Sequence, residues 1–260
     1  MSSRFFPLGR THGVSGIFLK ELDGHAEMKI TDTGTQSVLE LLNDIMISKM
    51  PDGSPLSPGD IPIADRDQIL ADVYLSLYGS RIETTVSCAY CDDFFDFRFS
   101  LDELIDHITD RDSTLEVSLC EDGNYELPGG IVFRLPTGKD ELAIMGHSTG
   151  QKEKILLDRC IIKGEEKAEK DIIEDAMTQV APMLDTTLSA TCPLCNGAQS
   201  FQFDIQPFLL SKLIMERKEL IRQMHQLASA YKWGHKEIMD LPRQQRQQYC
   251  AFIDFEKGNN

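Results

Sequence analysis

The sequence predicts an α+β protein: a zinc-ribbon-like β core built from two Cys-x-x-Cys knuckles, with a helical insertion and with helices at both ends. Short runs rich in β-branched and aromatic residues occupy the middle of the chain, whereas both ends have helical periodicity. Each of the two Cys-x-x-Cys pairs is followed by an alternating apolar stretch. We expect three regions: an N-terminal arm and helices (1–80), a β-rich zinc-knuckle core with a helical insertion (81–206) and a C-terminal helical hairpin (207–260).

The composition is that of a globular protein. The chain has 260 residues, of which 41% are hydrophobic and 26% charged, and this length allows a substantial core. It has no apolar run long enough to span a membrane, and its N-terminus lacks the apolar centre of a signal peptide, so we expect a cytoplasmic protein. The net charge of −16 disfavours broad contact with nucleic acid.

The last fifty residues differ in charge from the rest of the chain. They carry nine lysines and arginines against six acidic residues, so this tail is mildly basic and the remainder is strongly acidic. Such a tail is either an ordinary solvated helix face or a docking arm for a protein partner.

The N-terminal region gives two clear helix signals. Residues 1–34 have a weak apolar pattern, which is compatible with a short β-element or an ordered arm. The segment 37–50 has apolar residues at helical spacing. A second helix is expected over 65–78, with Asp65 as its cap, Gln68 three residues later and Gly79 as its end.

The middle of the chain changes to strand patterns and then returns to helices. We expect a turn capped by Asp140 in "LPTGKDE". Two lone cysteines in apolar settings, Cys120 and Cys160, are expected to be small buried hydrophobes. The predicted strands are 82–88, 95–101, 114–120, 124–129, 131–136 and 186–190, and the predicted helices are 151–162 and 164–184.

The C-terminal region is helical. Its apolar residues follow a period of 3.6 from Leu210 to Tyr231, which predicts one long amphipathic helix. After a break at Gly234, Pro242 suits the first turn of a final helix. That helix is expected to bury Tyr249, Phe252 and Ile253, with Trp233 as a packing anchor between the last helices.

The two cysteine pairs belong to a repeated unit. In each copy two thiols, two aromatic residues and one aliphatic residue have the same offsets, and a Thr-Thr stretch with strand character precedes the pair. The members are Cys88, Cys91, Phe97, Phe99 and Leu101 in the first copy, and Cys192, Cys195, Phe201, Phe203 and Ile205 in the second.

This unit predicts a structural zinc site. Two thiolates three residues apart reach one ion across a tight turn, and two such turns complete a tetrahedron of sulfur ligands. We therefore predict that one zinc ion is bound by Cys88, Cys91, Cys192 and Cys195, although the pairs lie 101 residues apart. A site with four thiolates has no open position, which makes an enzyme less favoured.

Three other interpretations of the cysteine pairs remain open. Two separate sites would each need further ligands, for which His107, His147 and Cys120 are candidates. A redox couple is disfavoured because thioredoxin-like pairs begin a helix, whereas each pair here is followed by a strand pattern. Reduced thiols without a metal are the third.

Several longer motifs follow one another in a distinctive order along the chain. They are "DRDQILADVYLSLYGSRIETTVSCAYC", "FRLPTGKDELA", "LLDRCI", "TTLSATCPLC", "FDI" and "LASAYKWGHKEIMDLPRQQRQQY". In this order they resemble a family of baseplate proteins from contractile-tailed phages and related injection systems, the group that contains a baseplate hub assembly protein of T-even phages. The first 35 residues do not match the family.

The resemblance implies a non-enzymatic role in building the baseplate hub, as an assembly factor, chaperone or structural component that binds hub proteins and no small-molecule substrate. It places the same four cysteines as zinc ligands. It also includes the ending that contains Arg243 and Arg246, which we expect on one exposed face of the last helix. The alternative functions are a zinc-ribbon nucleic-acid or transcription adaptor and a thiol oxidoreductase.

Overall fold

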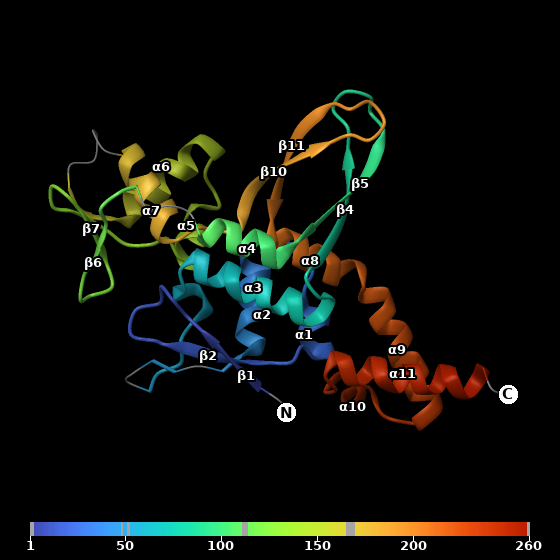
Figure 1. The fold of residues 1–260 in the computed structure, drawn as a ribbon. Coiled ribbons are helices and arrows are strands. Elements are labelled where there is room, and N and C mark those ends of the chain that lie inside the picture. Colours follow the sequence, from blue (N-terminus) through green and yellow to red (C-terminus); the bar gives the residue numbers. More distant parts are fainter. Residues whose placement is uncertain (1–2, 48, 51–52, 111–113, 165–169, 259–260) are drawn as a thin grey trace. The chain divides into compact units, whose positions relative to one another are not determined.

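The computed structural model describes residues 3–47, 49–50, 53–110, 114–164 and 170–258 and confirms the α+β class (Figure 1). The described helices alternate with small antiparallel sheets of two to four strands. No helix among these residues is long and apolar enough to cross a membrane. The chain divides into two compact units, which consist of Met1–Leu8, Val14–Pro58 and Leu209–Asn260, and of Gly9–Gly13 and Gly59–Phe208.

The first unit begins with a β-hairpin, so the weakly patterned N-terminal segment forms a β-element. Strands β1 (Ser3–Pro7) and β2 (Gly16–Lys20) pair antiparallel, and β3 (Met46–Ile47) adds to β2. Helix α1 (Gly24–Lys29) was not expected from the sequence. Helix α2 (Thr35–Ile45) confirms the first part of the predicted helix 37–50, but Met46–Ile47 form β3 in place of the continued helix. The apolar stripe of α2 is buried.

The C-terminal segment contains more helices than predicted. In place of one long helix, α8 (Ile205–Met215) and α9 (Arg217–Tyr231) are separated at Glu216. The break shifts the buried face, so Ile221 is 52% exposed while Gln226 is buried. Gln226 Nε2 donates to the Cys250 carbonyl at 3.2 Å and to Asp254 Oδ1 at 2.7 Å, so a hydrogen-bonded glutamine takes a place on the buried face.

The last two helices are α10 (His235–Met239) and α11 (Arg243–Gly258). Trp233 is confirmed as a packing residue, since its ring stacks on Tyr231 at 4.9 Å and meets Tyr249 edge-on at 5.1 Å. The predicted burial of Tyr249 and Phe252 is wrong, because these side chains are 36% and 63% exposed, whereas Ile253 is buried as predicted. The buried face of α11 includes Arg246, Cys250 and Ile253, which lie four and then three residues apart.

Arg243 and Arg246 do not lie on an exposed face as predicted. Both are buried in the first unit, and Arg246 is fully inaccessible. Arg243 Nη1 donates to Glu27 Oε2 at 2.9 Å, while Arg246 donates to Glu27 Oε1 and Arg243 also to Glu216. The burial follows from Glu27 on α1, a partner more than two hundred residues away that the periodicity of α11 cannot reveal.

We predict that Glu27→Ala strongly destabilises the first unit. The change leaves two buried guanidinium groups without their shared carboxylate, which should lower the free energy of unfolding by about 3–5 kcal/mol. Urea unfolding followed by the fluorescence of Trp233 measures this loss. The control is Asp44→Ala, which removes a partner of the exposed Lys29 and should cost about 1 kcal/mol or less. An equal loss of unfolding free energy in Glu27→Ala and Asp44→Ala would contradict the role of Glu27 as the shared partner of the two buried arginines.

The second unit contains a four-stranded antiparallel sheet and several helices. The sheet order is β6 (Ser118–Leu119), β7 (Tyr125–Leu127), β8 (Ile131–Phe133) and β9 (Ile161–Lys163). The helices described here are η1 (Pro58–Asp60), α3 (Ile63–Tyr78), α4 (Leu101–Thr109), α5 (Gly138–Ile144), α6 (Thr149–Cys160) and α7 (Lys170–Val180). Part of the predicted helix 164–184 falls on 165–169, outside the described residues.

The ends of these helices confirm one sequence prediction and correct others. Asp140 takes part in capping α5 as expected: Thr137 is the N-cap residue, and Asp140 completes a capping box by accepting from the Thr137 N–H and hydroxyl at 3.0 Å each. The predicted cap at Asp65 is wrong, since α3 begins at Ile63 and Asp65 instead accepts from the backbone N–H of Arg10 at 3.0 Å. Helix α4 was not expected from the sequence. Cys160 is buried as predicted, while Cys120 is partly exposed.

Asp67 is a carboxyl group buried inside α3. Its Oδ2 accepts from the Leu184 N–H at 3.1 Å, and Oδ1 lies 3.6 Å from Arg66 Nη2. Burial raises the pKa of Asp67 to about 7, the Arg66 guanidinium opposes this rise, and the negative charge of Asp204 adds to it. The folded state therefore retains a proton at Asp67 over a pH range in which the unfolded chain has lost it.

We predict that Asp67 makes the protein less stable as the pH rises from about 4 to about 7. In this window the folded state binds the extra proton, so each unit of pH lowers the free energy of unfolding by up to about 1.4 kcal/mol, and the cost is complete above pH 7. Asp67→Asn removes this titration. Urea unfolding by circular dichroism at pH 5 and pH 8 should show the variant gaining stability relative to the wild type at the higher pH. If the difference in the free energy of unfolding between Asp67→Asn and the wild type is the same at both pH values, the raised pKa of Asp67 is contradicted.

Candidate metal centre

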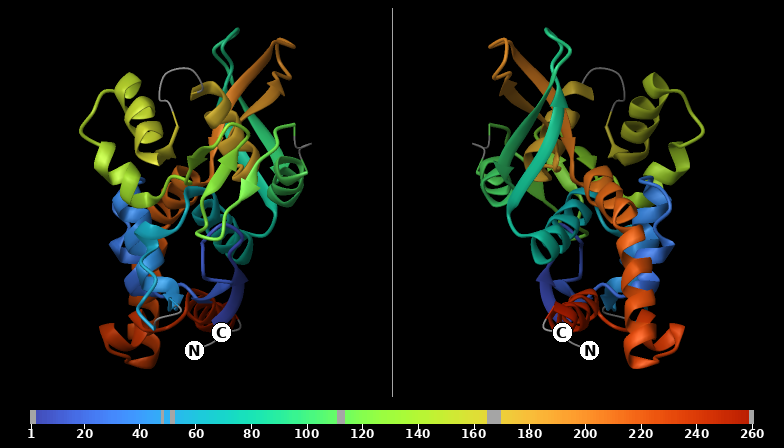
Figure 2. Two further views of the ribbon diagram at one scale, coloured as in Figure 1. Left: turned by 90° about the vertical axis from the view of Figure 1, so that its left-hand side faces the viewer. Right: turned by 90° about the vertical axis from the view of Figure 1, so that its right-hand side faces the viewer.

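Two β-hairpins of the second unit carry the cysteine pairs, and they have the same construction. The first consists of β4 (Arg81–Ser87) and β5 (Phe94–Ser100), and the second of β10 (Asp185–Thr191) and β11 (Ala198–Asp204). The registers coincide, because every paired position in the second hairpin lies 104 residues after its equivalent in the first. Figures 1 and 2 show the two hairpins side by side.

The turns that present the thiols are also equivalent. Cys88 N–H donates to the Asp93 carbonyl at 2.8 Å, and Cys192 N–H donates to the Gly197 carbonyl at 3.0 Å. The residue after the second cysteine has a left-handed backbone in both copies, with φ of 57° at Asp92 and 59° at Asn196. Aspartate and asparagine tolerate this conformation better than most residues, so the local sequence favours both turns.

The repeat continues beyond the hairpins into the helices that follow. The Leu101 N–H donates to the Ser80 carbonyl at 2.8 Å at the start of α4, and the Ile205 N–H donates to the Leu184 carbonyl at 3.1 Å at the start of α8. Each copy is therefore a strand, a cysteine turn, a second strand and the start of a helix. The repeated offsets in the sequence predicted the first three of these, while the helices emerge from the structure.

Equivalent aromatic residues of the two copies pack against each other. Phe97 meets Phe201 at 5.0 Å between ring centroids and 81° between planes, and Phe99 meets Phe203 at 5.1 Å and 82°. Because like positions meet, the two hairpins are related by an approximate two-fold axis. The edge-to-face geometry is favourable for aromatic pairs and holds the two cysteine turns close together.

The four thiols of the repeat converge at one place. Their sulfur atoms all lie within 4.8 Å of one another, with Cys88 Sγ 3.6 Å from Cys195 Sγ and Cys91 Sγ 3.9 Å from Cys192 Sγ. A tetrahedron with zinc–sulfur bonds of about 2.3 Å has sulfur atoms about 3.8 Å apart. The thiols are free and not bonded as disulfides. The cluster therefore has the donor set and the spacing of a four-thiolate metal site.

Burial differs within each pair in the same way. The first cysteines, Cys88 and Cys192, are 1% and 0% exposed, whereas Cys91 is partly exposed and Cys195 is exposed. The buried thiols lie in an apolar cluster with Val86, Phe95 and Ala190. The site thus has one side in the hairpin core and one side toward solvent.

The electrostatics of the cluster favour a bound cation. The Tyr90 N–H, 3.4 Å from Cys88 Sγ, lowers the pKa of the Cys88 thiol to about 7. The Asp93 N–H has the same tendency at Cys91, but burial and the neighbouring thiols raise the pKa of Cys91 to about 12. Four sulfur atoms this close cannot all be ionised unless a positive charge compensates them, and a metal ion supplies that charge.

The geometry brings together the four predicted ligands and leaves out the other candidates. Among the described residues, the cluster of potential metal ligands consists of the four cysteines and does not include His107, His147 or Cys120. Sequence reasoning missed a residue that supports the site from the second hairpin. Gln199 links the two hairpins, since its side chain accepts from the Ala89 N–H at 2.8 Å and donates to the Ser87 carbonyl at 3.1 Å. No spacing rule in the sequence indicates this contact.

Comparison with known proteins found no matching family model, no matching curated protein and no matching solved structure. The description of the site therefore depends on the residues and their geometry.

We predict one metal ion per chain at this cluster. Cys88→Ser and Cys192→Ser each remove a buried ligand from a different hairpin, so both variants should lose the ion if it is shared. Elemental analysis of purified protein gives the stoichiometry. Cys120→Ser, which changes a thiol outside the cluster, is the matched control and should retain the ion. Two ions per chain, or full retention in either cluster variant, would contradict a shared site.

Proposed function

We propose that Cys88, Cys91, Cys192 and Cys195 hold one zinc ion with a structural role. The observation that carries this proposal is the convergence of four thiols from two equivalent hairpins at tetrahedral spacing. Thiolates are soft ligands that suit zinc, and four of them fill its tetrahedral coordination. Such a site leaves no position for a substrate or a reactive water, so its function is to hold the two hairpins together.

This role matters because each hairpin forms only a two-stranded sheet. An isolated two-stranded hairpin is marginally stable in water, and these two gain stability from each other through the aromatic pairs and the thiol cluster. Structural zinc supplies on the order of 10 kcal/mol in small zinc-finger peptides. Removal of the ion should therefore disorder the hairpin tips before it affects the four-stranded sheet.

We further propose that the protein is a non-enzymatic assembly factor or component of a contractile-tail baseplate hub, which acts by binding other proteins. Two features support this role: the sequence resemblance described above and an apolar surface at the hairpin tips. Tyr90 and Leu194 occupy equivalent positions in the two cysteine turns and are 67% and 63% exposed, and nearby Phe94 is 71% exposed. Exposed apolar side chains that gather on a rigid support are typical of protein-binding surfaces.

Deletion of the gene in a producing cell tests the assembly role. Electron microscopy of the particles should show tails without complete baseplates, and expression of the wild-type chain should restore them. The double variant Tyr90→Ser, Leu194→Ser should restore assembly poorly although it retains the metal ion, because it alters the tip and none of the ligands. The matched control is Leu119→Ser, which removes an exposed apolar side chain from a different sheet.

Two results would favour the alternative functions instead. Salt-dependent binding of the purified chain to DNA or RNA would indicate a nucleic-acid adaptor. Turnover of a disulfide substrate that is lost when one cysteine of a single pair is changed would indicate a thiol oxidoreductase. Normal particles after deletion of the gene would overturn the baseplate role and leave the metal site untouched.

A further inference from the structure

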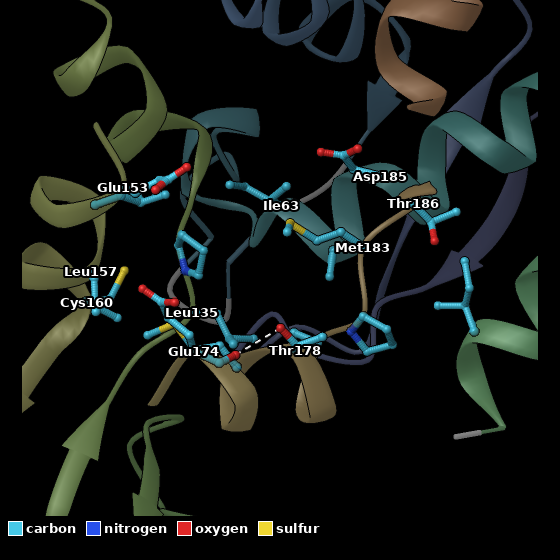
Figure 3. Close-up of a pocket in the computed structure, with 17 residues that line it drawn as sticks. Ile63, Leu135, Glu153, Leu157, Cys160, Glu174, Thr178, Met183, Asp185 and Thr186 are labelled. Carbon is cyan, nitrogen blue, oxygen red and sulfur yellow. Dashed lines mark hydrogen bonds between the residues drawn. The ribbon is translucent and has the colours of Figure 1, made fainter. Parts of the chain in front are cut away.

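The second unit also contains an apolar cavity, whose lining includes none of the four clustered cysteines. It has a volume of about 370 Å³, which lies within the range of roughly 300–1,000 Å³ typical of ligand pockets. Helices α3, α4, α6 and α7 and the start of β10 contribute side chains to it (Figure 3). Apolar lining residues include Ile63, Leu135, Leu157 and Met177.

The cavity opens to solvent, and three of its exposed lining residues are acidic. Glu153, Glu174 and Asp185 are all exposed lining residues, and they come from α6, α7 and β10 respectively. Figure 3 shows their carboxylates spread around the cavity. Met183 is 41% exposed beside them, and its unbranched side chain can adapt to different partners.

The carboxylates around the cavity are not neutralised by the protein. Within the described parts of the chain, none of the three forms an ion pair, and the lining includes no lysine, arginine or histidine. Two cations on the same helices have other partners, since Arg159 Nε on α6 lies 2.9 Å from Asp140 Oδ1 and Lys170 Nζ on α7 lies 2.5 Å from Asp158 Oδ1. Negative charge at the mouth of an apolar cavity attracts a ligand that is both cationic and apolar.

We propose that this cavity binds a peptide segment of a partner protein in which a large apolar side chain is flanked by lysines or arginines. The apolar side chain enters the cavity, and the cationic side chains pair with Glu153, Glu174 and Asp185. A peptide fits better than a small cation because the three carboxylates lie on three separate elements around the opening, so several charges along a chain reach them together. This inference rests on the proposed role in protein binding and adds the chemistry of the partner.

A defined peptide tests the proposal. The probe is a short fluorescein-labelled peptide of alternating leucine and lysine, and its binding to the full metal-loaded chain is measured by fluorescence anisotropy at physiological ionic strength. We expect saturable binding that weakens roughly tenfold or more in the double variant Glu153→Lys, Glu174→Lys. The control, Glu116→Lys with Asp175→Lys, makes the same change in net charge at exposed positions outside the lining and should bind as the wild type does.

A second variant separates shape from charge. Thr178→Trp keeps the charge of the chain and places a bulky ring at an exposed lining position, so it should also weaken binding. Metal content and thermal unfolding of each variant show whether it is folded. A peptide with serine in place of leucine should bind much more weakly, as should one with glutamate in place of lysine.

Four outcomes would overturn the proposal. The first three are no binding of the peptide to the wild type, binding of the serine peptide as tight as that of the leucine peptide, and a loss of affinity in the control variant equal to that in the cavity variant. The fourth is self-association of the chain that the cavity variants abolish, because a second copy of the chain would then be the occupant. If the peptide does not bind as expected but deletion of the gene still causes baseplate defects, the peptide-binding proposal is overturned and the assembly role stands. Normal baseplates together with specific peptide binding would overturn only the assembly role.

Discussion

The crowding of four sulfur atoms at the tips of two hairpins is the constraint on which this part of the structure depends. Thiols within 4.8 Å of one another either stay largely protonated or share a cation. Each hairpin supplies only two of them, and neither hairpin belongs to a larger sheet that would stabilise it. The packing of Phe97 on Phe201 brings the turns together, and the thiols can then act as one site. The aromatic contacts and the proposed ion are therefore interdependent.

The equal registers of the hairpins show that the site is built from a structurally repeated unit. Identical pairing, equivalent turn hydrogen bonds and a helix that starts at the same position would each be ordinary alone. Together they make two segments of more than twenty residues structurally equivalent. The two-fold arrangement of these segments places two thiols from each copy around one centre. It also explains why the first cysteine of both pairs is buried and the second lies nearer to solvent.

Local pattern in the sequence was enough to predict which four cysteines cluster and most of the strands around them. The spacing of Cys88 and Cys91, and the period-two aromatic residues that follow, depend on neighbours along the chain. Sequence reasoning failed where a partner lies far away. Arg246 is buried because its guanidinium donates to the Glu27 carboxylate. Asp65 does not cap a helix and instead accepts a hydrogen bond from the backbone N–H of Arg10. Periodicity assigns a charged side chain to solvent by default, and only the three-dimensional partner reverses that assignment.

The two cysteine turns pack against each other through residues that differ between the copies. A side chain at Gly197 would place its Cβ 2.5 Å from the ring of Tyr90, so any larger residue there would require this ring to move. The equivalent position in the first copy is Asp93, and the residue equivalent to Tyr90 is Leu194, so the two copies diverge here. Tyr90 thus packs one face against the opposite turn and remains 67% exposed on the other. A large side chain that already packs on one face would lose less conformational freedom on binding the proposed partner, which supports the proposal that the hairpin tips form the protein-binding surface.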